Sequence, residues 1–228
     1  MKTILVLLFT SYMLLADALP QRIETSIKSV NHQQVQLNNS VPRGMSGIVV
    51  HNYGNGLIAI THAVISQGDN RAKIIPYSAT LHQNIPSVQT DVQANDKVIL
   101  GNFYNNVLLI APDAKSYTNI TKRFKKIWIH PDAYALDFMK EGLSAISKNS
   151  LQKFAQANQV GLVLIATQNK LLILDPISKK FLGQMPLKLQ NNKALKPFFS
   201  RFEQMDVSLF GFSKVILKEY FQAVKEIN

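Results

Sequence analysis

The sequence predicts an α+β fold in which an N-terminal β-rich domain, a small barrel or curled antiparallel sheet, precedes a small α/β domain. Residues 22–110 contain many short apolar runs separated by turn residues, with little helical periodicity, as in antiparallel barrels and sheets. Residues 127–187 instead combine helical spacing with closely spaced apolar runs. We therefore expect two domains, 19–115 and 116–228, with their boundary near residues 112–117.

The first 18 residues have the pattern of a cleavable export signal. Lys2 supplies a positive charge, Ile4–Leu15 is almost uninterrupted in its apolar character, and Ala16 and Ala18 fit the small-x-small cleavage pattern before Leu19. A stretch of about a dozen apolar residues is shorter than the roughly 20 that a helix needs to cross a bilayer. We therefore expect an exported protein of the periplasm or cell surface, with at most peripheral membrane association.

The N-terminal half predicts strands joined by tight turns. Turn-forming residues cluster at 31–32, 41–44, 52–56 and 105–106, between runs that alternate or are continuously apolar. We expect the last of these turns to join its two flanking strands as a hairpin. The expected strands cover 22–30, 33–37, 48–50, 57–60, 63–65, 72–75, 97–100 and 107–110.

The C-terminal half predicts two helices, a three-stranded meander and a closing helix. Pro131 ends the first strand of this half, and Asp132 is placed to cap the helix that follows. The continuous apolar run at 160–166 is typical of a strand that is covered on both faces. The expected elements are a strand at 127–130, helices at 133–141 and 149–159, strands at 160–166, 171–174 and 181–187, and a helix at 213–227.

Composition excludes some classes of chemistry. The 228 residues contain no cysteine, which excludes thiol catalysis, cysteine–zinc sites and iron–sulfur clusters. The formal net charge is +11, and it is the same without residues 1–18 because Lys2 and Asp17 leave together. A basic protein outside the cytoplasm meets anionic lipid, polysaccharide or acidic proteins rather than nucleic acid, so we expect no nucleic-acid partner.

Histidines and hydroxyls give little support for an active site. His51 and His62 could face each other across a hairpin, but no partner acid stands at zinc-binding spacing. Ser46 lies between glycines in a segment that leads into a strand, which is not the strand–turn–helix elbow of a serine hydrolase. Asp175 precedes a proline and indicates a turn. We expect no enzymatic activity, no cofactor and no metal.

The basic clusters are the better candidates for function. A lysine in an exposed turn presents a compact cation on a flexible stem, which suits capture by a carboxylate-lined aromatic pocket. One cluster lies near the domain boundary, one in the turn after Asp175, and one in a polar loop together with Lys188. The candidate binding residues are Lys122, Lys125, Lys126, Lys179, Lys180, Lys193 and Lys196.

Four segments of the chain resemble the N-terminal domain of the plasminogen-binding proteins of Helicobacter, Campylobacter and related bacteria. They are residues 44–51, 96–101, 108–112 and 128–132, and the last, Trp-Ile-His-Pro-Asp, is the most distinctive. The resemblance implies a cell-envelope protein that recruits host plasminogen through its lysine-binding kringle domains. Proteins named for this activity look longer and end in lysine, whereas this sequence ends at Asn228, so internal lysines would have to act.

The second half also resembles, in architecture, small envelope modules such as the N-terminal domain of TolB. This likeness implies a different hypothesis, a periplasmic interaction or assembly module that has an envelope protein, and no host protein, as its partner.

Overall fold

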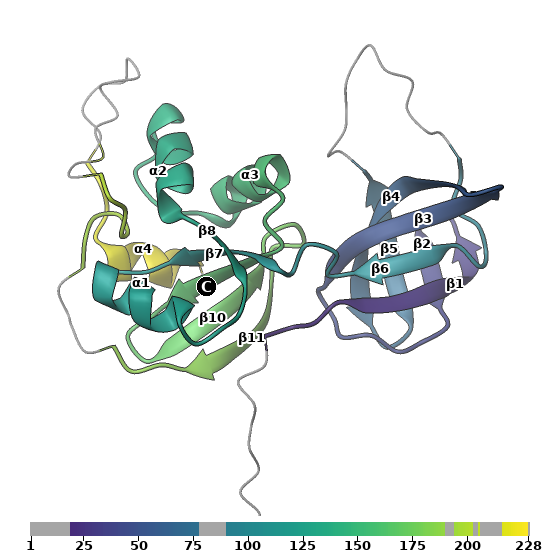
Figure 1. The fold of residues 1–228 in the computed structure, drawn as a ribbon, viewed down its shortest axis with the longest axis horizontal. Helices are drawn as coiled ribbons and strands as arrows, with labels where there is room; N and C mark the ends of the chain where they lie inside the picture. Colours follow the sequence, from purple (N-terminus) through teal and green to yellow (C-terminus); the bar gives the residue numbers. More distant parts are fainter. Residues whose placement is uncertain (1–18, 78–89, 190–193, 203–204, 206–215, 228) are drawn as a thin grey trace, which may run out of the picture.

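The computed structural model describes residues 19–77, 90–189, 194–202, 205 and 216–227, so the expected export signal lies outside the described residues. The fold is α+β, as predicted (Figure 1). Six strands form a closed barrel in the order β1-β2-β5-β4-β3-β6, and five more form a sheet in the order β11-β10-β9-β7-β8 that is flanked by helices.

The barrel is antiparallel throughout and closes where β6 pairs with both β1 and β3. Gly47 of β3 allows this closure, because a Cβ atom there would lie 2.2 Å from the carbonyl oxygen of Ile99 in β6. The expected strands 57–60 and 63–65 are one continuous strand, β4. The barrel strands are β1 (Ile23–Asn31), β2 (Gln34–Leu37), β3 (Ser46–Gly54), β4 (Leu57–Gly68), β5 (Arg71–Pro76) and β6 (Lys97–Leu100).

The strand after β6 belongs to the other sheet, so the expected hairpin between 97–100 and 107–110 is wrong. β7 (Asn106–Ile110) pairs in parallel with β8 (Ile127–Ile129) and with β9 (Leu162–Ala166). The chain therefore changes from one sheet to the other between residues 100 and 106, ahead of the expected boundary near 112–117.

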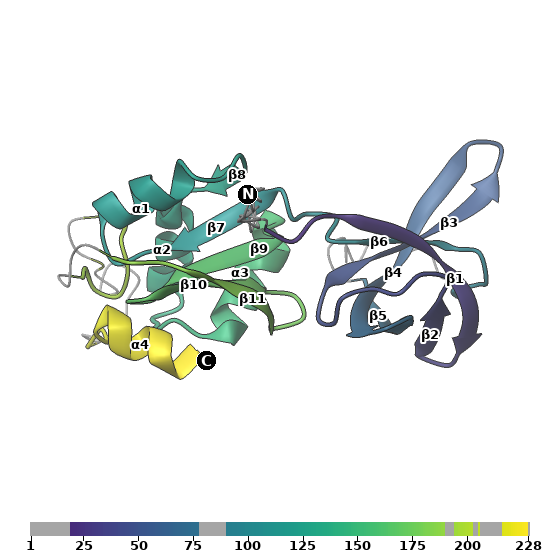
Figure 2. The same ribbon diagram turned by 90° about the horizontal axis from the view of Figure 1, so that it is seen from below.

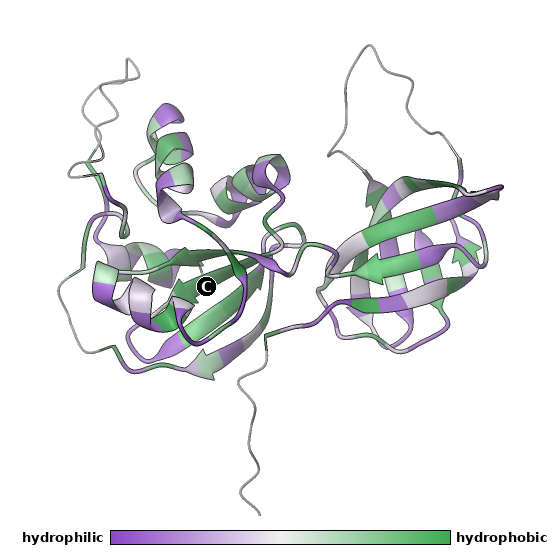
Figure 3. Cartoon of the chain, in the orientation of Figure 1, coloured by the Kyte–Doolittle hydropathy of each residue, from purple (hydrophilic) through white to green (hydrophobic). Residues whose placement is uncertain are grey.

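The expected meander is confirmed at one side of the five-stranded sheet. β10 (Lys170–Asp175) pairs antiparallel with β9 and with β11 (Lys180–Pro186). Every residue of β9 is buried, and so are the last five of β10, because both faces of these strands are covered. Figure 3 shows the same contrast, with mainly hydrophobic central strands and helices that alternate between polar and apolar residues.

Helices cover both faces of this sheet (Figure 2). The connection from β7 to β8 and the connection from β8 to β9 step across the sheet in opposite directions, and right-handed crossovers then place their helices on opposite faces. Accordingly, Ile120 of α1 packs in one core cluster, while α2, α3 and α4 pack in the other. The helices are α1 (Ala114–Thr121), α2 (Pro131–Lys140), α3 (Lys148–Asn158) and α4 (Tyr220–Ile227).

Two of the helices differ from the expectation. Helix α1 is absent from the elements that the sequence predicts. It begins after Asp113, whose carboxylate caps the helix by accepting from the backbone N–H of Ser116. The closing helix begins at Tyr220 rather than near 213, since residues 216–219 are not helical and residues 213–215 lie outside the described residues. No helix among the described residues is long and apolar enough to cross a membrane.

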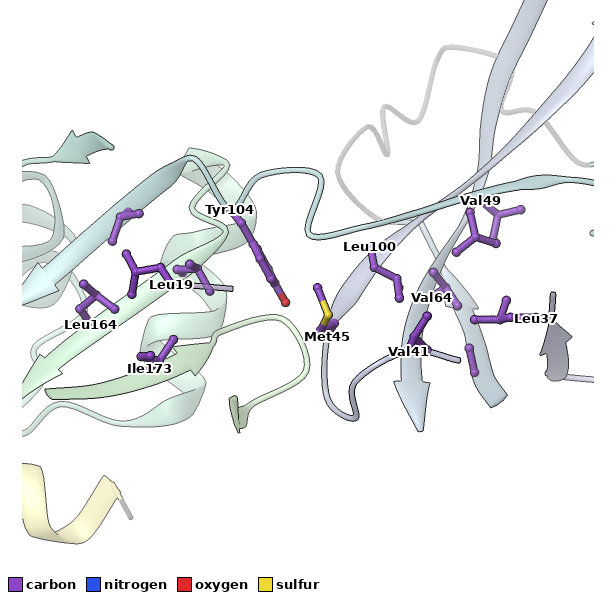
Figure 4. Packing of buried hydrophobic residues seen from close by; sticks show 14 of the residues in the cluster. Leu19, Leu37, Val41, Met45, Val49, Val64, Leu100, Tyr104, Leu164 and Ile173 are labelled. Carbon is purple, nitrogen blue, oxygen red and sulfur yellow. The ribbon is translucent and has the colours of Figure 1, made fainter. Parts of the chain in front are cut away.

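One hydrophobic core runs through the barrel and into the five-stranded sheet. Leu37 and Val64 inside the barrel belong to the same cluster as Leu164 and Ile173 of the sheet, with Met45 and Tyr104 between them (Figure 4). Leu19, the first described residue, is also buried in this cluster, beside the sheet and not in the barrel. The core beside the sheet therefore contains residues that precede the barrel in the sequence as well as residues that follow it.

The carboxylate of Asp175, fully buried at the end of β10, joins the two domains. Its Oδ2 accepts hydrogen bonds from the backbone N–H and the hydroxyl of Ser46 in the barrel, both at 2.7 Å, and from the hydroxyl of Tyr104 at 2.6 Å. Its Oδ1 accepts from the backbone N–H of Ser178, which fixes the turn that the sequence predicts. Burial and the nearby Asp175 charge raise the pKa of Tyr104, so its hydroxyl stays protonated and donates.

Replacing Asp175 with Asn is expected to destabilise the protein without changing the shape of the side chain. The asparagine amide would bring an NH₂ group, itself a donor, against the four groups that now donate to the carboxylate, and at least one of them would lose its acceptor. We expect the free energy of unfolding to fall by about 2–4 kcal/mol. Thermal unfolding followed by circular dichroism at pH 7 should show a midpoint lower by roughly 5–15 °C. Asp69→Asn, at an exposed carboxylate, is the control and should shift the midpoint by no more than about 1 °C.

Candidate binding surface beside the domain junction

The edge of the five-stranded sheet that faces the barrel carries two of the basic clusters. The parallel strands β7, β8 and β9 begin at this edge, β10 ends there at Asp175, and β11 begins there at Lys180. The strand order places β8 and β11 on opposite sides of the sheet, four strand spacings or about 19 Å apart. The clusters before β8 and before β11 therefore flank the domain junction from two sides.

The cluster before β8 contains lysines in different environments. Lys122 ends α1 and Lys125 follows it, and both side chains are exposed. Between them, the guanidinium of Arg123 lies 5.5 Å from the centre of the Phe124 ring, which steadies the turn. Lys126 is half-buried, and its ammonium donates to the carbonyl oxygen of Tyr104 at 3.1 Å.

Lys126 therefore has a structural role at the junction between the barrel and the α/β domain. Desolvation by burial lowers the pKa of its ammonium, and the group that receives its hydrogen bond belongs to the residue whose hydroxyl holds Asp175. A partner that captured Lys126 would have to break this contact. The two exposed lysines of the cluster carry no such cost.

The other candidate lysines divide in the same way. Lys179 donates to the side-chain oxygen of Asn149 at 2.7 Å, while the neighbouring Lys180 is exposed at the start of β11. Lys196 forms an ion pair with Glu219 just before α4. Lys193 lies outside the described residues.

Three of the seven predicted lysines thus have exposed ammonium groups with no ion pair or hydrogen bond to the described part of the chain: Lys122, Lys125 and Lys180. The charge around them is also uneven. Residues 101–228 contain 18 Lys and Arg against nine Asp and Glu, whereas residues 19–100 contain six against four. The positive charge of the protein is therefore concentrated on the α/β half.

The histidines are not arranged as the sequence suggested. Across the β3–β4 hairpin, His62 lies opposite Val49 and His51 lies opposite Ala59, so the two imidazoles do not face each other. His51 instead forms a 2.6 Å contact with the buried carboxylate of Asp96. Among the described residues, no group of three or more His, Asp or Glu side chains has a metal-binding arrangement.

The Trp-Ile-His-Pro-Asp block has a structural role at the start of α2. The cap of α2 is His130 and not Asp132, because the chain stays extended up to Pro131 and the imidazole Nδ1 then accepts from the Asp132 N–H. The Asp132 carboxylate is left to accept from the backbone N–H and the guanidinium of Arg201, at 2.8 and 2.6 Å. Trp128, which the sequence places in a strand, is half-buried against the larger core cluster.

Asp132 makes the stability of the protein sensitive to acid. Partial burial alone would raise the pKa of its carboxyl, but the two hydrogen bonds from Arg201, together with the nearby His130, hold that pKa below its ordinary value. A carboxyl whose pKa is lowered by folding stabilises the folded state above its unfolded pKa, near 4, and loses this contribution as the pH falls through the folded value.

We expect Asp132→Asn to lower the thermal midpoint at pH 7 by roughly 2–4 °C, a loss of about 1 kcal/mol given that Arg201 is largely exposed. The difference from the unmodified protein should narrow as the pH falls below about 4, because Asp132 then becomes protonated in the folded state as well as in the unfolded state. Asp137→Asn removes the same charge from the same helix and serves as the control. A midpoint difference that is independent of pH would contradict this role of Asp132.

Comparisons with known proteins agree with this organisation. The family model described as "Plasminogen-binding protein pgbA N-terminal" matches residues 22–227. Plasminogen-binding protein PgbA of Helicobacter pylori, from strains 26695 and J99, is 28% identical over 184 residues, which is 78% of this chain and 40% of the relative. The chain thus spans about 40% of the length of these relatives, and no solved structure matches it. Because the family model covers both the barrel and the α/β domain, the chain belongs to the family of plasminogen-binding protein pgbA N-terminal domains.

Proposed function

We propose that this chain is an exported cell-envelope binding protein that recruits plasminogen through exposed lysines, chiefly Lys122 and Lys125. The observation that carries the proposal is a pair of exposed ammonium groups in the turn between α1 and β8 that have no ion pair or hydrogen bond to the described residues. The relatives are named for plasminogen binding, and this turn lies on the more basic half of the chain.

The chemistry of a lysine-binding kringle explains the choice of these two residues. Such a site takes one ammonium into a pocket of carboxylates and aromatic rings, so a lysine that is already paired must first give up its partner. Lys196 would have to leave Glu219, and Lys126 would have to leave the Tyr104 carbonyl. Lys122 and Lys125 give up only water, and Lys180 offers a second, more distant point of attachment.

Export is supported by the position of the expected cleavage site, directly before a residue that is buried in the core. Cleavage after Ala18 would make Leu19 the first residue of the mature protein, and the side chain of Leu19 is buried in the core. A binding role in place of catalysis is supported by Ser46 and Asp175, whose hydroxyl and carboxylate hydrogen-bond to each other to hold the domains together. The host partner would then meet the protein at the cell surface.

The test is binding of residues 19–228 to immobilised plasminogen at physiological salt, with and without 6-aminohexanoic acid, a lysine analogue. We expect saturable binding that the analogue abolishes. The double variant Lys122→Glu/Lys125→Glu should bind at least tenfold more weakly, because each 1.4 kcal/mol lost changes the affinity tenfold, and its thermal midpoint should stay within about 2 °C of the unmodified protein.

The matched control is Lys28→Glu/Lys73→Glu, which makes the same change of net charge with two exposed lysines of the barrel. Equal loss of binding in both double variants would replace lysine capture by general electrostatic attraction. If the unmodified protein does not bind, or binds only at low salt, the better function is an envelope interaction module without a host partner.

A further inference from the structure

The hairpin of β3 and β4 extends beyond the barrel at the end far from the α/β domain (Figures 1 and 2). β6 pairs with β3 only as far as Val50, and β5 pairs with β4 only from His62 onward. Between these points, residues 51–61 pair only with each other among the described residues. We call this two-stranded segment the distal ribbon.

The distal ribbon is fixed in its projecting position. The imidazole of His51 contacts the Asp96 carboxylate, the hydroxyl of Tyr53 hydrogen-bonds to Thr90, and the two rings meet edge to face at 4.6 Å. Both partners, Asp96 and Thr90, belong to the segment that leads into β6. Contacts within the chain therefore hold the base of the distal ribbon in place, and the projecting position of its tip does not require a binding partner.

The ribbon exposes apolar side chains at its tip and carries no charge. Leu57 is 62% exposed, Ile58 is 63% exposed, and Ile60 and Tyr53 are exposed as well. Residues 44–68 contain no Asp, Glu, Lys or Arg, although 17% of the whole chain is charged and about four such residues would be expected in a run of this length. A surface hairpin in a basic protein normally carries charges, so this run needs a physical reason.

A bilayer interface accounts for both features. Each charged side chain is penalised in the hydrocarbon, whereas leucine and isoleucine are favoured there, and tyrosine is enriched at the boundary with the headgroups. A second copy of the chain fits less well, because a stable interface uses about 20–30 residues on each side and the ribbon has only eleven.

Two lysines lie at the base of the distal ribbon, at the level that lipid headgroups would occupy if the tip entered a bilayer. Lys97 of β6 lies beside Val50 at the base of the ribbon, in an exposed ion pair with Glu24 that a lipid phosphate would have to replace. Lys28 of β1 lies two residues beyond the strand partner of Lys97, on the side toward the ribbon. Five residues of strand separate this base from the tip, or about 17 Å. A tip buried by about 5–10 Å would leave both lysines roughly 10 Å above the hydrocarbon, within reach of lipid phosphates.

We propose that the distal ribbon inserts Leu57 and Ile58 into the interface of a phospholipid bilayer and so holds the protein peripherally on a membrane. The inference does not depend on plasminogen binding, which the proposed function assigns to the other half of the chain. The geometry points the basic α/β half away from the lipid surface, since the ribbon projects from the opposite end of the molecule.

The test is flotation of residues 19–228 with vesicles of phosphatidylethanolamine and phosphatidylglycerol in a 3:1 ratio, at physiological salt. We expect the protein to float with the vesicles and Leu57→Ser/Ile58→Ser to float at least fivefold less, with an unchanged thermal midpoint because both side chains are exposed. The matched control, Ile127→Ser/Leu195→Ser, removes two exposed apolar side chains elsewhere and should float like the unmodified protein.

A spectroscopic readout tests insertion directly. The chain has one tryptophan, so Leu57→Trp in a Trp128→Phe background reports on the tip alone. Its emission should shift to the blue with vesicles and be quenched by brominated lipid. No flotation of the unmodified protein, or flotation that 1 M salt abolishes and the serine variant keeps, would overturn the proposal. So would a dimer in analytical ultracentrifugation that the serine variant dissociates while no vesicle binding occurs.

Discussion

The buried carboxylate of Asp175 is the interaction on which the relation between the two domains depends. It is fully buried and accepts hydrogen bonds from Ser46, Tyr104 and Ser178, and no Lys, Arg or His in the described part of the chain forms an ion pair with it. A buried charge of this kind is tolerable only while every donor stays in place. Since the donors come from the barrel, from the crossover after it and from the β10–β11 turn, the carboxylate couples three segments that would otherwise meet only through apolar packing.

Glycine completes this junction where side chains cannot fit. A Cβ atom on Gly161, just before β9, would lie 2.1 Å from the carbonyl oxygen of Phe103, so the crossover that carries Tyr104 can press directly onto the sheet. The ammonium of Lys126 also holds the crossover in place by donating a hydrogen bond to the Tyr104 carbonyl oxygen. The exposed lysines Lys122 and Lys125 are thus close in sequence to a tightly packed junction.

Much of the fold follows from local patterns in the sequence. The alternating and continuous apolar runs place nearly every strand, because side-chain period and burial are local properties of a strand. The same runs do not reveal partners. Residues 107–110 are a strand as predicted, yet they pair with β8 and β9, since periodicity contains no information about which strands are adjacent. Helix α1 is not evident from the sequence, because it is short and its fully buried residues are only Ser116 and Ile120.

The candidate site shows the same division between local and distant information. The turn at Asp175 was predictable from Pro176, but its contact with Ser46 spans 129 residues. The sequence around Asp132 predicts a helix cap because a helix begins there, whereas the partner of its carboxylate, Arg201, is 69 residues away. The sequence identifies seven candidate lysines but does not show which of them have an intramolecular partner. What separates Lys125 from Lys126, or Lys180 from Lys196, is a partner that only the folded chain brings close.

The burial of Leu19 beside the five-stranded sheet has a consequence for how the chain assembles. Residue 19 packs in the same cluster as Leu164 and Ile173, so the α/β domain takes its first piece from one side of the barrel and the rest from the other. In this sense the barrel is an insertion within the α/β domain. The six barrel strands all lie within residues 23–100, whereas the sheet against which Leu19 packs includes β10, which ends at Asp175, 75 residues after Leu100. The barrel strands can therefore pair with one another without the α/β sheet, whereas the burial of Leu19 requires that sheet to be formed.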